Sequence, residues 1–190
     1  MTTDDFWHLV ETARNHTTPD RPFDQALVEL LSRRTRREIL EYQERFDELQ
    51  EALYRWDVWA AAYLIGGGCS DDSFMDFRAG LIAQGREWYE RAAAAPDSLA
   101  EHPAVLAAGD GLDERALFFE EVNYCAAGAF EVVVGSVEGF YEAWKEYAAE
   151  RPDPGSAASD MGEDFDFDDL SEMRRRLPRL AGVFLSEKSG

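Results

Sequence analysis

The sequence predicts an all-α protein, with a single compact multi-helix domain around a long central helix and an acidic, partly flexible C-terminal tail. Three observations favour this class. Apolar residues recur at spacings of three and four along most of the chain, capping residues precede several of these runs, and Gly or Pro follows them. The chain has 190 residues, of which 45% are hydrophobic and 13% aromatic, so it can bury one core.

Two helices are expected before the central one. Residues 4–15 place Phe6, Leu9 and Val10 at helical spacing, and the sequence Thr-Thr-Pro-Asp ends that pattern. Residues 22–33 repeat the pattern, with proline in a first turn, where its missing N–H is not needed.

The central helix is predicted over residues 35–65. Thr35 and Glu38 form a capping box at its start, and its apolar residues follow steps of three and four without Gly or Pro. An apolar stripe of this kind would also suit a coiled-coil dimer, but no other segment continues the stripe for a comparable length. We therefore expect one long helix that packs against the other helices of the same chain.

Glycines 66–68 are expected to end this helix, because glycine enters left-handed backbone conformations without a steric penalty. Ser70 is then the predicted N-cap of a helix over residues 71–95. Within that helix, Gly80 and Gly85 allow either a close helix crossing or a kink. Two substantial helices should therefore meet at the glycine turn.

Shorter elements follow this pair. A brief helix is predicted at residues 98–101, a buried helix at about 113–134 and a further helix at 136–149. The three valines at 132–134 would also suit a strand, but the length of the apolar run favours a helix.

The predicted boundaries place a helical domain at residues 1–151, an acidic linker at 152–169 and a short C-terminal helix or tail at 170–190. Residues 163–169 are dense in carboxylates, which is typical of a mobile, solvated linker. They lack the glycine and the ligand spacing of an EF-hand loop, so calcium binding is not favoured. The apolar residues that follow suggest a terminal helix that docks back on the body.

The charge balance is strongly acidic, since 39 Asp and Glu against 19 Lys and Arg give a formal net charge of −20. This charge repels nucleic-acid phosphates and anionic lipid headgroups, so we expect no nucleic acid and no membrane as a partner. It suits either solubility in a crowded cytoplasm or a basic protein partner attracted over a long range. All but two of the bases are arginine, which suggests a GC-rich bacterial genome.

A cytoplasmic location is expected, because the N-terminus carries no basic region followed by an apolar one. Cys69 and Cys125 then lie in a reducing compartment and are not expected to form a disulfide. The three histidines show no ligand spacing with either cysteine, so we expect no metal and no cofactor. The oligomeric state stays open between monomer and homodimer.

The turn from Gly66 to Arg78 concentrates flexible backbone, a thiol, three acids and an arginine between two helices, and it marks the expected pocket. The residues expected to form this pocket are Trp56, Asp57, Cys69, Ser70, Asp71, Asp72, Asp76 and Arg78. No nucleophile, base and ligand set with diagnostic spacing occurs in the chain, so the catalytic residues stay unknown. Cys69 is expected to be a small packed side chain, because the adjacent acids raise the pKa of its thiol.

Asp57 should be partly desolvated at the edge of the apolar stripe, so it needs a cation, and Arg78 on the neighbouring helix is the expected partner. We interpret this pair first as a clamp between the two helices, with a ligand site as the alternative. A magnesium site is a further alternative, since Asp72 and Asp76 share a helix face and could bind the ion with Asp57 or Glu121.

Residues 54–65 (YRWDVWAAAYLI), 67–74 (GGCSDDSF) and 77–86 (FRAGLIAQGR) resemble the bacterial family catalogued as domain of unknown function 4240. The opening Phe6-Trp7 and the pair Phe46-Asp47 fit the usual start of that family as well. The resemblance extends from residue 4 to about residue 130. It implies a cytosolic helical domain that is common in actinobacteria, and it brings no established activity.

Two functions from different classes follow from these observations. The favoured one is a non-enzymatic acidic interaction protein, regulatory or toxin-immunity-like, that binds a basic protein partner through its anionic surface and an aromatic groove around Trp56 and Trp59. The alternative is a small hydrolase or transferase with an acidic pocket around the turn from Gly66 to Arg78. Whether the chain is an enzyme stays open on the sequence alone.

Overall fold

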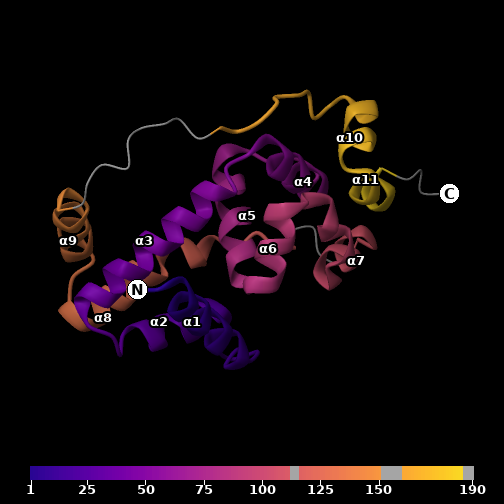
Figure 1. The fold of residues 1–190 in the computed structure, drawn as a ribbon. Coiled ribbons are helices and arrows are strands. Elements are labelled where there is room, and N and C mark those ends of the chain that lie inside the picture. Colours follow the sequence, from indigo (N-terminus) through magenta and orange to yellow (C-terminus); the bar gives the residue numbers. More distant parts are fainter. Residues whose placement is uncertain (112–115, 151–159, 186–190) are drawn as a thin grey trace. The chain divides into compact units, whose positions relative to one another are not determined.

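The computed structural model describes residues 1–111, 116–150 and 160–185, and within these ranges it contains helices and no strand (Figure 1). The predicted all-α class is confirmed. Contacts group the chain into two compact units, unit 1 with residues 1–49 and 120–158 and unit 2 with residues 50–119 and 159–190. None of the helices in the described ranges combines the length and the apolar character that a membrane span requires.

Unit 1 contains the N-terminal helices and the helices that precede the acidic tail. Its elements are α1 (Thr3–Asn15), α2 (Phe23–Leu31), most of α3 (Arg36–Ala52), the 3₁₀ helix η2 (Glu120–Tyr124), α8 (Cys125–Val134) and α9 (Glu138–Ala149). α2 packs against both α1 and α8. Buried aromatic rings join α1 to α3, because Phe6 stacks on Tyr42 and Tyr42 stacks on Phe46, with 4.9 Å and 6.2 Å between centroids.

The helices predicted at residues 4–15, 22–33 and 136–149 are confirmed as α1, α2 and α9. The helix predicted over 113–134 is wrong in its first half. Leu117 has a left-handed backbone conformation (φ 71°), which interrupts a helix, and only α8 continues through the three valines as an α-helix. Residues 112–115 lie outside the described chain.

Unit 2 contains the glycine turn and the C-terminal helices. Its elements are α4 (Trp56–Gly66), α5 (Asp71–Ala83), α6 (Arg86–Ala94), the 3₁₀ helix η1 (Pro96–Glu101), α7 (Pro103–Gly109), α10 (Leu170–Arg176) and α11 (Pro178–Phe184). α11 packs against α4, η1 and α7, and Met173, Leu177 and Leu180 are buried. The prediction that a terminal helix docks back on the body is therefore confirmed.

The single central helix predicted over residues 35–65 is wrong. α3 ends at Ala52 and α4 begins at Trp56, with Arg55 in an extended conformation between them (φ −139°, ψ 148°). In a continuous helix the N–H of Trp56 would pair with the carbonyl of Ala52. It donates instead to the carbonyl of Met161, at 3.0 Å. No Gly or Pro marks the break, and the carbonyl that accepts the N–H of Trp56 lies more than one hundred residues later in the sequence.

The glycine turn is confirmed. Gly67 closes α4 in the left-handed conformation (φ 64°). Ser70 caps α5, and its hydroxyl oxygen accepts the N–H of Ser73 at 3.3 Å. The helix predicted over residues 71–95 is divided into α5 and α6 at Gly85, whose positive φ (88°) ends the first helix.

Candidate functional site

Four aromatic side chains at the start of α4 and on α5 form one stacked group, which we call the aromatic cluster: Tyr54, Trp56, Trp59 and Phe74. Trp56 stacks on Trp59 with 5.5 Å between centroids and 9° between planes, and Trp59 stacks on Phe74 with 4.7 Å and 12°. Phe74 is fully buried, whereas the other three rings are half-buried. The cluster therefore extends from the core of unit 2 to its surface.

Arg78 lies against the cluster at Phe74 and Tyr54. Its guanidinium carbon is 4.8 Å from the ring centroid of Tyr54 and 4.9 Å from that of Phe74, within cation–π range. Nη1 donates to the carbonyl of Gln50 at 3.0 Å, in the last turn of α3, where carbonyls lack helical partners. Burial lowers the pKa of Arg78, although a guanidinium stays charged at neutral pH. Arg78 therefore stabilises the C-terminus of α3.

The predicted ion pair between Asp57 and Arg78 is not formed. Arg55 binds Asp57 instead, with Nε 3.0 Å from Oδ1 and Nη2 2.5 Å from Oδ2. This bidentate pair forms because the extended link before α4 places the guanidinium of Arg55 beside a carboxylate two residues on. Arg55 also donates to the carbonyl of Ala93 at the end of α6, at 2.7 Å. Arg55 therefore connects the start of α4 to the end of α6, whereas the prediction assigned the clamp between helices to Arg78.

The remaining residues of the predicted pocket lie at the turn between α4 and α5. The carbonyl of Cys69 accepts a hydrogen bond from Nε1 of Trp59 at 3.1 Å, which fixes the turn to the aromatic cluster. Asp71 and Asp72 are exposed in the first turn of α5, where the helix dipole favours carboxylates. Asp76 follows one turn later and is half-buried.

The predicted pocket residues therefore separate into two sets. Trp56, Cys69 and Arg78 contact or belong to the aromatic cluster, whereas the others cap α5, lie along it or pair with Arg55. Among the described residues, no three His, Cys, Asp or Glu side chains converge as metal ligands would. The alternative magnesium site that includes Asp72 and Asp76 is therefore not formed in this structure.

The thiol of Cys69 is a poor nucleophile. Burial, followed by the charges of Asp71 and Asp76, raises the pKa of this thiol to about 12. We expect iodoacetamide to modify Cys69 in the folded protein roughly a hundredfold or more slowly than an unstructured cysteine at neutral pH, because only the thiolate reacts. Mass spectrometry of the alkylated peptides over time measures this rate, and the denatured protein supplies the reference. Similar rates in the two states would contradict the prediction.

The described part of the predicted acidic linker, residues 160–169, leads into α10 (Figure 1), and we call it the acidic segment; its Phe167 contacts the aromatic cluster. Phe167 contacts the ring of Trp56 edge-on at 6.0 Å between centroids, and its centroid is 5.4 Å from that of Tyr63. Phe165 and Phe167 are half-buried, whereas the acidic residues that alternate with them are exposed. The acidic segment thus has an apolar inner face and an anionic outer face, as extended chains do.

Polar contacts hold the acidic segment at both ends. Near its start, the carbonyl of Met161 accepts the N–H of Trp56 at 3.0 Å. Near its end, the hydroxyl of Tyr63 donates to Asp168 at 2.6 Å, and this hydrogen bond raises the pKa of Tyr63. The first of these contacts satisfies the N–H of Trp56, the first residue of α4, at the break between α3 and α4.

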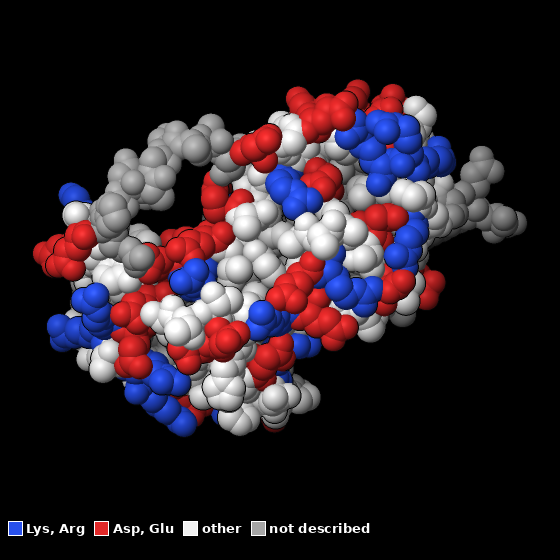
Figure 2. Space-filling view, in the orientation of Figure 1, with Lys and Arg blue, Asp and Glu red and all other residues white. Residues whose placement is uncertain are grey.

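α10 presents a basic surface next to the acidic segment. Figure 2 shows Lys and Arg side chains gathered over α10, beside Asp and Glu side chains. Arg176 pairs with Glu163 at 2.9 Å and with Glu172 at 3.0 Å, and its guanidinium carbon is 4.2 Å from the ring centroid of Phe165. Hydrogen bonds from Arg175 and Arg176 lower the pKa of Glu172 to about 2. This basic surface therefore anchors the acidic segment.

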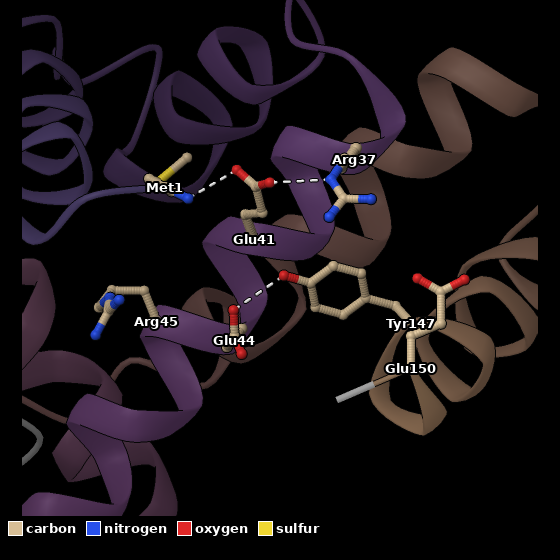
Figure 3. A pocket seen from close by; sticks show the side chains of 7 residues that line it. All are labelled: Met1, Arg37, Glu41, Glu44, Arg45, Tyr147 and Glu150. Carbon is tan, nitrogen blue, oxygen red and sulfur yellow. Dashed lines mark hydrogen bonds and ion pairs between the residues drawn. The ribbon is translucent and has the colours of Figure 1, made fainter. Parts of the chain in front are cut away.

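Unit 1 holds a separate polar pocket of about 370 Å³ between α3 and α9 (Figure 3). The lining residues are Met1, Arg37, Glu41, Glu44, Arg45, Tyr147 and Glu150. Glu41 pairs with the amino group of Met1 at 2.7 Å and with Nε of Arg37 at 3.2 Å, and the hydrogen bond from the amino group lowers the pKa of Glu41. The hydroxyl of Tyr147 donates to Glu44 at 2.9 Å. Three of the pocket's charged groups, those of Met1, Arg37 and Glu41, are therefore paired with one another.

The sequence prediction omits several components of this site. It includes Trp56 and Arg78 but neither Tyr54 nor Phe74, because apolar residues at helical spacing are typical of an ordinary core. It interprets residues 160–169 as a solvated linker from their charge density. The alternation of Phe and Asp within that segment is the signal that predicts a chain packed by one face.

The fold and the site define an acidic, all-helical protein whose surface aromatic side chains are covered by a segment of the same chain. The model of a protein family described as "Protein of unknown function (DUF4240)" matches residues 1–132. The chain belongs to this family, and the resemblance seen in the sequence is confirmed. Searches of the curated proteins and of the solved structures found no significant match. The family match includes the aromatic cluster and Arg78, whereas the acidic segment lies outside it.

Proposed function

We propose that this chain is a non-enzymatic acidic interaction protein that binds a basic protein partner, in a regulatory or toxin-immunity-like role. The observation that carries this proposal is the outer face of the acidic segment. Phe167 packs on the rings of α4 and Phe165 packs on Phe167, whereas Asp164 and Asp166 are exposed. Fixed charges on an ordered backbone bind a partner with less loss of conformational freedom than the same charges on a free chain.

The net charge of −20 supports the same assignment. Long-range attraction raises the association rate with a cationic protein, and it disfavours nucleic acids and anionic membranes as partners. We therefore propose a cytoplasmic protein, monomeric or homodimeric in its free state. Its partner carries a patch of Lys or Arg.

The alternative, a small hydrolase or transferase at the turn from Gly66 to Arg78, has weaker support. Cys69 carries a raised pKa, and Arg78 is engaged with Gln50 and two aromatic rings. A thermal-shift screen with metals, nucleotides and small anions tests this alternative, because a specific ligand raises the melting temperature by mass action. A shift that disappears in Asp72→Ala would favour the enzyme over the interaction protein.

The interaction proposal predicts a specific loss of affinity for a short lysine-rich peptide at low salt. The double variant Asp164→Asn and Asp166→Asn should raise the Kd roughly fivefold or more, because it removes two fixed charges from the proposed binding face. Asparagine retains the oxygen at position 166 that accepts the N–H of Asp168, so the backbone turn is kept. Isothermal titration calorimetry measures the affinity.

The matched control removes two charges from another exposed surface. Glu142 and Glu146 are exposed on α9 of unit 1, and Glu142→Gln with Glu146→Gln changes the net charge by the same amount. This control should raise the Kd less than twofold or so, through the general charge alone. Equal losses in the two double variants would show that the peptide senses only net charge, and the proposed face would be rejected.

A further inference from the structure

The acidic segment occupies a surface that would otherwise expose large aromatic rings. Phe167 contacts Trp56, Trp59 and Tyr63, with centroid separations of 6.0, 6.4 and 5.4 Å. Removal of the segment would leave two adjacent tryptophans and a tyrosine open to solvent on α4. Contiguous exposed aromatic side chains of this kind are typical of protein interaction sites.

The acidic segment is held by individual contacts and not by a regular element: hydrogen bonds at Met161 and Asp168, the ion pair of Glu163 with Arg176, and the ring contacts of its two phenylalanines. Between Met161 and Asp168 the described residues form no regular helix or strand, and both phenylalanines are only half-buried. The following helices are held much more firmly, because Met173 and Leu180 are fully buried in unit 2. The segment can therefore leave the aromatic surface while α10 and α11 stay in place, since regions with few buried contacts open at the lowest free energy.

We propose that the acidic segment is a displaceable cover, and that the aromatic surface under it binds an extended segment of a partner with two aromatic side chains two residues apart. The seated sequence Phe165-Asp166-Phe167 is the template for that chemistry, because Phe167 lies on the rings of α4 and Phe165 packs against Phe167 and the guanidinium of Arg176. Basic residues next to the partner's rings would first pair with the fixed carboxylates of the closed cover, and would keep these ion pairs when the cover leaves the aromatic surface. This inference rests on the proposed binding of a basic protein and adds the apolar part of the recognition.

The cover lowers the affinity for such a partner by competition within one molecule. If the aromatic surface is open in about one molecule in ten or fewer, the apparent affinity falls by a factor of about ten or more. Arg176 strengthens the closed state, because it pairs with Glu163 and lies over the ring of Phe165. Variants that remove the inner face of the cover should therefore bind a partner segment more tightly than the original chain.

The experiment uses the full chain and two synthetic peptides. The first has the sequence of residues 160–169 with lysine in place of Asp164, Asp166 and Asp168, and the second also has alanine in place of both phenylalanines. The two peptides carry the same charge, so the difference between their Kd values reports the contribution of the aromatic rings alone. Fluorescence anisotropy of the labelled peptides measures the Kd for the original chain and for the variant Phe165→Ala with Phe167→Ala.

We expect the first peptide to bind this variant at least about tenfold more tightly than the original chain, and the second peptide to show no such gain. Tyr63→Phe provides a second test, because it removes only the hydrogen bond to Asp168 and should give a smaller gain in the same direction. If the first peptide bound the original chain and both variants with equal affinity, the acidic segment would not compete for the aromatic surface, and the proposal of a displaceable cover would be rejected. Equal Kd values of the two peptides for the double alanine variant would show that the surface does not recognise aromatic side chains. The proposed role of the carboxylates is tested separately, by the Asp164→Asn and Asp166→Asn variant.

Discussion

Gly80→Ala should lower the free energy of unfolding by about 3 kcal/mol, because a Cβ atom at this position would overlap the carbonyl oxygen of Leu117. Leu117 is 1% exposed and its backbone is already in the left-handed region (φ 71°), so it has little freedom to move away. Alanine is favoured over glycine in a helix interior by about 1 kcal/mol. The overlap with a buried backbone atom outweighs that gain.

Urea unfolding followed by circular dichroism measures this effect, and Gly128→Ala is the matched control. Gly128 lies inside α8, and a Cβ atom there would meet only the side chain of Val28, at an ordinary 3.6 Å. We expect the control to leave the stability unchanged or to raise it by up to about 1 kcal/mol. If both variants were equally stable, the close approach of Leu117 to α5 would not exist in solution.

The sequence predicts those parts of the fold that local rules determine. Helix starts with a capping residue, such as Ser70, and helix ends with glycine, such as Gly67, lie where the pattern places them. The break between α3 and α4 follows no local rule. At the break, the N–H of Trp56 donates to Met161 and Arg78 donates to Gln50, and both contacts join segments that are distant in the sequence.

The same distinction applies to the candidate site. The turn around Cys69 and Ser70 is visible in the sequence, because glycine, serine and acidic residues mark helix boundaries. The ion-pair partner of Asp57 is not visible in the sequence. The prediction assumed one unbroken helix, whereas Arg55 lies in an extended link and pairs with Asp57. The partial burial of Phe167 depends on a surface formed by residues more than one hundred positions earlier in the sequence.

Arg78→Met should lower the free energy of unfolding by about 2 kcal/mol, because it removes a charge-assisted hydrogen bond and two cation–π contacts while it keeps the apolar stem. The loss is limited, since the carbonyl of Gln50 also accepts the N–H of Leu53 at 3.2 Å and would not be left without a partner. Arg78→Lys should recover only part of the loss, because an ammonium group cannot reproduce the planar stacking of a guanidinium.

Urea unfolding of these variants is compared with that of Arg33→Met. Arg33 forms an exposed i, i+4 pair with Glu29 at 2.5 Å, and its side chain is 67% exposed. Pairs of this kind contribute about 0.5 kcal/mol or less, so the control should change the stability little. If Arg78→Met were as mild as the control, Arg78 would not stabilise the end of α3, and its role as a ligand-binding residue would become the better interpretation.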